Sequence, residues 1–174
     1  MIDITKFQND QNEDAETLYL LELKIGEQKN EPATERLGGM RNLALLYKDS
    51  GQISKAGTLL LECLHICEEH IPVGDNAHLR TLNNLAAYYV EDEDYEKAES
   101  FMVKALKGCE ETLGPEDPKT IVTMNNLAHI YGEQERIEEA LELNQKALKM
   151  RLKVLGPSHP ETLSSYNNLA SVYE

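Results

Sequence analysis

A single tripeptide, Asn-Leu-Ala, recurs along the chain at a constant interval. It begins at Asn42, Asn84, Asn126 and Asn168, so successive copies start 42 residues apart. Three further series keep the same period: Tyr47, Tyr89, Tyr131 and Tyr173; Ala56, Ala98 and Ala140; and Leu64, Leu106 and Leu148. One period shared by several residue types indicates a repeat protein, in which copies of one supersecondary unit stack on their neighbours.

Each repeat has the pattern of two helices. In the second repeat an apolar stripe with the i, i+3, i+4, i+7 spacing of a buried helix face is formed by Leu82, Leu85, Ala86 and Tyr89. The acidic residues 91–94 predict a turn, and a second apolar run follows from Tyr95 to Leu106. Gly114 can end that helix, and Pro118 can begin the next because proline is tolerated in a first helical turn.

This pattern predicts the organisation of the whole chain. We expect a frayed tail over residues 1–12 and a solenoid over residues 13–174. The solenoid has a lone second helix at about 13–28, repeats at about 34–75, 76–117 and 118–159, and a further first helix within 160–174. The predicted first helices are 34–48, 78–90, 119–132 and 161–173. The loop before the first repeat is one residue shorter than its counterparts. Small alanines recur in both helices, where they allow close helix packing.

These residues resemble the tetratricopeptide repeat, and in particular the longer 42-residue form found in kinesin light chains and related bacterial proteins. The motifs that carry the resemblance include Thr81-Leu82-Asn83-Asn84-Leu85-Ala86, Tyr95-Glu96-Lys97-Ala98-Glu99 and Leu155-Gly156-Pro157-Ser158-His159-Pro160. The resemblance covers about residues 15–174. It implies an all-α fold, a right-handed superhelical solenoid of antiparallel helix pairs. It also implies a non-catalytic interaction module or adaptor whose first helices line a concave groove.

That groove predicts a set of peptide-binding residues on the first helices. The set is Arg41, Asn42, Arg80, Asn83, Asn84, Asn125, Asn126, His129, Asn167 and Asn168. An amide side chain both donates and accepts hydrogen bonds, so a row of asparagines can pair with the main chain of an extended peptide of any sequence. The alternative is that these asparagines bond neighbouring repeats or cap a turn, and both interpretations can hold together.

Charge limits the class of partner. The net charge of −14 disfavours nucleic acid and anionic membrane surfaces, and no segment has the roughly 20 apolar residues of a membrane span. The predicted first helices carry +3 and the remainder −17, although including four flanking acids changes +3 to −1. We therefore expect Arg41 and Arg80 to accept acidic residues of a protein or peptide partner. The acidic second helices are explained equally well by solubility.

Few residues suggest chemistry. Cys63, Cys67 and His70 share one predicted helix and could ligate zinc, but Cys63 aligns with alanines of later repeats, and a free cysteine is commonly a small buried apolar residue. No metal, cofactor or catalytic group is expected. Three cysteines suit a reducing, cytoplasmic location, and residues 1–10 lack the apolar core of a secretion signal.

Two other functions remain open. The chain could be a structural or oligomerisation scaffold, or a regulatory fragment of a larger multidomain protein. The last helix carries Leu163, Tyr166 and Tyr173 at spacings that elsewhere face a second helix. This pattern predicts a homo-oligomer formed through the C-terminal helix.

Overall fold

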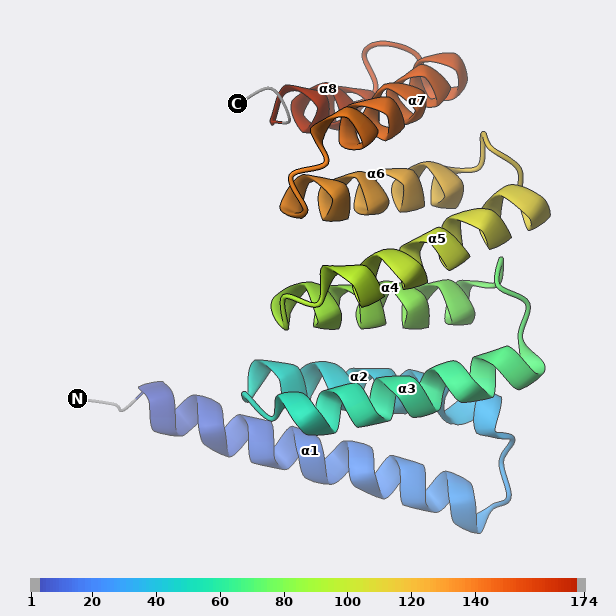
Figure 1. Ribbon diagram of the computed structural model, residues 1–174. Helices are drawn as coiled ribbons and strands as arrows, with labels where there is room; N and C mark the ends of the chain where they lie inside the picture. The colour runs from blue at the N-terminus through green and yellow to red at the C-terminus, as the bar shows by residue number, and fades with distance from the viewer. Residues whose placement is uncertain (1–3, 172–174) are drawn as a thin grey trace. The chain divides into compact units, whose positions relative to one another are not determined.

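The computed structural model describes the backbone of residues 4–171 and the side chains of residues 13–170. Within this part of the chain every regular element is an α-helix, and no strand occurs, so the predicted all-α class is confirmed (Figure 1). The helices are α1 (Ile4–Gln28), α2 (Ala33–Asp49), α3 (Ile53–His70), α4 (Asn76–Glu91), α5 (Tyr95–Thr112), α6 (Pro118–Glu133), α7 (Ile137–Leu155) and α8 (Pro160–Ser171).

Hydrophobic periodicity located the helices closely. The first helices of the repeats, α2, α4, α6 and α8, begin within two residues of the predicted starts, and α2, α4 and α6 end within one residue of the predicted ends. Tyr173, predicted as the last residue of α8, lies outside the described residues. Helix α1 begins at Ile4, whereas the sequence predicts a frayed tail over residues 1–12. Neither glycine nor proline occurs in residues 4–25, so nothing in that segment interrupts helical backbone geometry.

The chain packs as two compact units, Met1–Asn84 and Leu85–Glu174, and the division falls inside α4. In the first unit α2 packs against both α1 and α3. In the second unit α6 packs against α5 and α7, and α7 packs against α8. Helices that follow one another along the chain are therefore packing neighbours within each unit, as stacked helix pairs require.

Small residues form the centre of each helix pair. Ala56, Ala98 and Ala140, near the start of the three second helices, have no exposed surface. The core of the first unit combines Leu37 and Met40 of α2 with Cys63 and Cys67 of α3. The core of the second unit contains Ile121, Met124 and Ala147. All three cysteines are free and buried, so they act as small apolar residues, as the sequence predicts.

A buried polar contact joins each second helix to the first helix that follows it. Within the first unit Cys67 Sγ lies 3.6 Å from Thr81 Oγ1. In the second unit Cys109 Sγ lies 3.9 Å from Thr123 Oγ1, and Arg151 donates from Nη1 to Ser165 Oγ at 2.7 Å. Each pair is separated by 14 residues, and successive pairs are 42 residues apart. This contact was not predicted, although the regular spacing of the three hydroxyl residues signals it.

The turn between the two helices of each complete repeat contains a residue whose backbone has a positive φ, in the left-handed region. Gly51, Glu93 and Glu135 occupy equivalent positions and have φ of 73°, 58° and 59°. Glycine adopts this conformation at no steric cost, whereas a residue with a Cβ is strained there. Two of the three turns therefore hold a strained glutamate where the first repeat has glycine.

This difference predicts a stabilising substitution. Glu93→Gly or Glu135→Gly should raise the free energy of unfolding by about 0.5–1 kcal/mol, because relief of left-handed strain exceeds the added backbone entropy of glycine. Urea denaturation monitored by circular dichroism measures the change. Glu96→Gly, in the first turn of α5, is the matched control and should lose about 1 kcal/mol. A loss of stability in Glu93→Gly would contradict this account of the turn.

The cores also predict thiol reactivity. Burial raises the pKa of Cys63 from 9.0 to about 12. At pH 8 this shift makes the fraction of Cys63 in the thiolate form about 1000-fold smaller than that of a thiol with the ordinary pKa. The thiolate is the species that reacts with disulfide reagents. In the native protein Cys63 should therefore react with an aromatic disulfide at least that much more slowly than a model thiol. In denaturant all three cysteines should react at ordinary rates. Rapid labelling of native Cys63, located by mass spectrometry, would show that the α2–α3 core is open.

Candidate functional site

The repeated tripeptide places its residues on different sides of each first helix. In α6, Leu127 and Ala128 are buried and Asn126 is exposed. Asn42 of α2 and Asn168 of α8 are also exposed, and Asn84 of α4 is half-buried. The apolar pair thus holds the helix in its unit while the asparagine faces away from the core. This placement follows from 3.6 residues per turn, which puts adjacent positions on different faces.

The first unit separates the two predicted arginines. Arg80 of α4 is exposed, and Asn83 beside it is half-buried. Arg41 of α2 is only 9% exposed, and its Nη1 donates to the backbone carbonyl of Ala77 at 3.4 Å. Loss of solvent around its guanidinium lowers the pKa of Arg41 below the ordinary value of an arginine. In the structure Arg41 therefore connects α2 to α4, whereas Arg80 faces solvent.

The second unit exposes most of its predicted residues. Asn126, His129, Asn167 and Asn168 are exposed on α6 and α8, and the imidazole Nε2 of His129 lies 3.7 Å from a carboxylate oxygen of Glu133. Asn125 is half-buried. Its side-chain oxygen is buried and finds no hydrogen-bond partner among the described residues.

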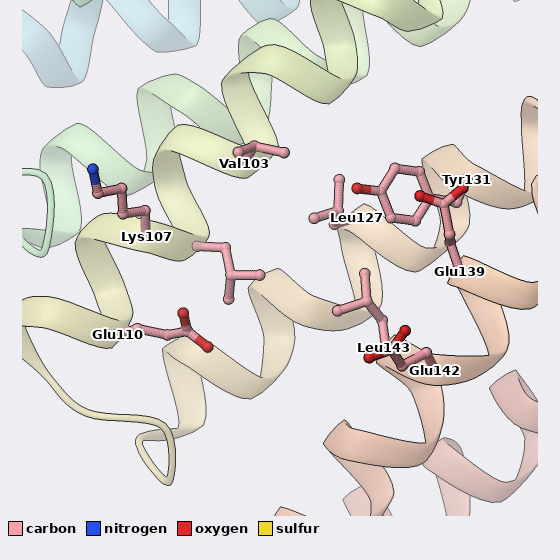
Figure 2. Close-up of a pocket in the computed structure, with 9 residues that line it drawn as sticks. Val103, Lys107, Glu110, Leu127, Tyr131, Glu139, Glu142 and Leu143 are labelled. Atoms are coloured by element: carbon pink, nitrogen blue, oxygen red, sulfur yellow. The ribbon is translucent and has the colours of Figure 1, made fainter.

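A pocket that sequence reasoning missed lies between α5, α6 and α7 (Figure 2). It has a volume of about 340 Å³. Its apolar wall consists of Val103, Leu106, Leu127, Tyr131 and Leu143, and its polar edge consists of Lys107, Glu110, Glu139 and Glu142. In Figure 2 the Tyr131 hydroxyl is directed toward Leu127 and Val103, whereas Lys107 extends away.

An equivalent pocket lies in the first unit between α1, α2 and α3. Its volume is about 420 Å³. Leu43, Tyr47 and Leu59 line it, and they precede Leu127, Tyr131 and Leu143 of the other pocket by 84 residues, or two repeat lengths. The same site therefore recurs in both units. Sequence reasoning concentrated on the first helices, and these pockets depend on consecutive second helices, so only the recurring tyrosine signalled them.

A cation lies over the tyrosine of each repeat. Lys55 Nζ is 4.9 Å from the ring centre of Tyr47, and Lys97 Nζ is 4.9 Å from that of Tyr89. In the third repeat the position equivalent to Lys97 is occupied by Glu139, so the cation over the ring must come from another residue. Arg136 supplies it instead, with its guanidinium carbon 4.1 Å from the ring centre of Tyr131.

The ion pair beside this cation is reversed between repeats. Asp94 pairs with Lys97 at 2.5 Å, whereas Arg136 pairs with Glu139 at 2.6 Å across the same three-residue spacing. The bonds from Lys97 lower the pKa of Asp94, and those from Arg136 lower the pKa of Glu139. Each pair is partly exposed, and Arg136 also pairs with Glu99 of α5 at 2.6 Å. These ion pairs hold the cation over the ring, and partly exposed pairs of this kind contribute modestly to stability.

The described surfaces offer several kinds of group for contact with a ligand. Among the described residues no group of three or more His, Cys, Asp or Glu is placed to hold a metal ion. No described helix combines the length and apolar character that crossing a bilayer demands. The exposed side chains offer amide hydrogen bonds, and the pockets offer apolar walls with charged edges.

Comparison with known proteins agrees with this architecture. Residues 77–153 match the tetratricopeptide repeat family model. No protein of curated function matches the chain. A crystal structure of nearly identical TPR-like repeats, from a protein of Podosopora anserina assigned as a kinesin light chain, is 26% identical and has a TM-score of 0.80. That match covers 95% of this chain and 79% of the other.

More distant structures share the fold alone. BtubC (BKLC) from P. vanneervenii is 23% identical over 97% of this chain and 67% of its own, with a TM-score of 0.82. The N-terminal domain of stress-induced protein-1 (STI-1) from C. elegans is 16% identical over 81% of this chain and 97% of its own, with a TM-score of 0.57. Repeats of this family are protein–protein interaction modules in general. Residues 77–153 are therefore similar to the tetratricopeptide repeat, and the fold of the chain is similar to that of TPR-like repeats from a protein assigned as a kinesin light chain.

Proposed function

We propose that the chain is a non-catalytic adaptor that holds an extended segment of a partner protein along the asparagine-bearing side of its first helices. The observation that carries this proposal is the repeated exposure of one amide. Asn42, Asn126 and Asn168 are exposed at equivalent positions on α2, α6 and α8. The leucine that follows is buried in α2 and α6 and half-buried in α8. Regularly spaced amides suit a peptide main chain, which alternates donors and acceptors.

Charge favours a partner segment with acidic residues. Within the structural bounds of α2, α4, α6 and α8 the basic and acidic residues are equal in number, five of each, whereas the whole chain carries −14. An acidic segment therefore meets less repulsion along these helices than elsewhere. Arg80 is exposed and can form charge-assisted hydrogen bonds with it. Arg41 supports the site indirectly, because its guanidinium bonds to the start of α4.

A pull-down with a triple variant tests the proposal. Immobilised wild type should retain a specific protein from extract, and the variant with Asn42→Ala, Asn126→Ala and Asn168→Ala, which removes the three exposed amides, should not retain it. Arg80→Glu should weaken the same complex about tenfold or more by introducing repulsion, and added salt should weaken the wild-type complex.

The matched control is Asn76→Ala with Gln145→Ala, which removes exposed amides away from the repeated position. All variants should keep the wild-type helical circular dichroism spectrum. Equal retention of the partner by the triple variant and the control would rule out the asparagine row. Tighter binding after Arg80→Glu would rule out an acidic partner.

We propose self-association through α8 as a second candidate function. Leu163 is 51% exposed and Tyr166 is 44% exposed, whereas Ile121 and Met124, at the equivalent positions of α6, are 2% and 0% exposed. Covering such side chains is worth roughly 1.5–3 kcal/mol each, so a second copy packed on this face would gain stability. A scaffold role would follow if copies associate in this way.

Sedimentation equilibrium at micromolar concentration tests this candidate. Wild type should show a mass that rises with concentration, and Tyr166→Glu should return it to that of the monomer, because a charge would be buried at the contact. Tyr88→Glu, at a half-buried position on α4, is a control and should leave association unchanged. A wild type that is monomeric throughout, with the same mass as Tyr166→Glu, would remove self-association from consideration.

A further inference from the structure

One position in the second helices lies beside the tyrosine of each of the three repeats. Leu59 of α3 and Leu143 of α7 occupy this position in the two pockets. In α5 the equivalent residue is Phe101, and its ring stacks on Tyr89 with 5.6 Å between ring centres and 21° between planes. The chain itself therefore shows that an aromatic ring packs well on the tyrosine of this repeat.

The pocket between α5, α6 and α7 lacks such a ring. Arg136 lies over the ring of Tyr131, and the pocket side of this tyrosine is lined by leucines and by Val103, which is 43% exposed (Figure 2). An apolar opening of about 340 Å³ beside an aromatic ring is typical of sites that take a side chain from a ligand. By analogy with Phe101 on Tyr89, the side chain that fits best is aromatic.

Charge at the edge of the pocket defines what flanks that side chain. Glu110, Glu139, Glu142 and Lys107 form this edge, and the first two acids are each paired with a cation that is not itself part of the lining. Glu110 pairs with Lys146 at 2.8 Å and Glu139 pairs with Arg136, whereas Glu142 is exposed beside the opening. The first-unit pocket has only Lys55 and Glu62, which balance. Glu142 stands at the opening while Lys107 extends away from it (Figure 2), and this acid together with the overall charge of −14 favours a basic segment at the second-unit pocket.

We propose that the pocket between α5, α6 and α7 binds an aromatic side chain flanked by Lys or Arg in a segment of a partner protein. This site is separate from the asparagine side of the first helices and prefers the opposite charge. A module with both surfaces can hold an acidic segment and a basic aromatic segment at the same time. The two proposals therefore stand or fall independently.

The probe is the synthetic peptide acetyl-Lys-Ala-Phe-Ala-Lys-amide, titrated into isotopically labelled full chain and followed by nitrogen–proton correlation NMR. Shifts should concentrate at Val103, Leu127, Tyr131 and Leu143. Replacing the peptide's Phe by Ala should weaken binding at least about tenfold, because the apolar anchor is lost. Replacing both Lys by Glu should weaken it about threefold or more, and salt should reduce that difference.

Leu143→Phe is the decisive variant, because it places in α7 the phenylalanine that α5 has at the equivalent position, Phe101. Its ring should fill the pocket over Tyr131 and weaken the peptide at least about tenfold, with the circular dichroism spectrum and melting temperature retained. Leu59→Phe makes the same change in the first-unit pocket and should leave the shifts at Tyr131 unchanged. Glu142→Lys should weaken the peptide about threefold or more.

A second pocket variant covers the case in which Leu143→Phe disturbs the fold. Val103→Lys alters an exposed side chain at the edge of the pocket, so folding should be unaffected, and it should weaken the peptide through lost apolar contact and added repulsion. Three results would each overturn the proposal. These are no localised shifts with the Phe peptide, equal binding of the Phe and Ala peptides, and binding that is unchanged in Leu143→Phe and Val103→Lys.

Discussion

The close approach of the two helices in each repeat is the constraint on which the rest of the structure depends. Ala56, Ala98 and Ala140 are fully buried at the beginning of the second helices. Ala44, Ala86 and Ala128 on the first helices are 1–3% exposed. Side chains of this size let helix axes approach closely, which fixes the relative position of the two helices. A larger residue at any of these positions would separate the pair and shift every contact beyond it.

The regular polar contacts depend on the same spacing. The 14-residue separation between Cys67 and Thr81 returns between Cys109 and Thr123 and between Arg151 and Ser165, although the partner of the hydroxyl changes from a thiol to a guanidinium. The three contacts therefore share their position in the repeat and their burial, although the chemical groups that form them differ. The hydroxyl also bonds within its own helix, as Thr81 does to the Ala77 carbonyl at 2.9 Å, so it is satisfied whatever faces it.

The helices and the core could be predicted from the sequence because both depend on periodic apolar residues. The alternation of Leu82, Leu85 and Tyr89 determines which side of α4 is buried, whatever surrounds it. Left-handed Glu93 and Glu135 could not be predicted from their own chemistry, since glutamate has no preference for that backbone region. Only alignment with Gly51 reveals them.

The candidate surfaces were predicted less completely, for a related reason. Exposure of Asn126 follows from its place between buried residues of one helix. Burial of Arg41 depends on where α4 begins, and the pockets depend on the distance between consecutive second helices. Such features belong to packing between helices that are distant in sequence, and a periodic pattern within one helix does not contain them.

The reversed ion pair bears on how a protein of this kind can change its length. Asp94 and Lys97 exchange their signs as Arg136 and Glu139, and each pair leaves a cation over the tyrosine of its own repeat. A repeat gained or lost by duplication or deletion would therefore take both charges of this local pair with it. Other ion pairs join neighbouring repeats, because Arg136 also pairs with Glu99 at 2.6 Å and Lys146 pairs with Glu110 at 2.8 Å. A change in the length of the array would therefore keep the local pair, whereas the pairs between neighbouring repeats would have to form again at each new junction.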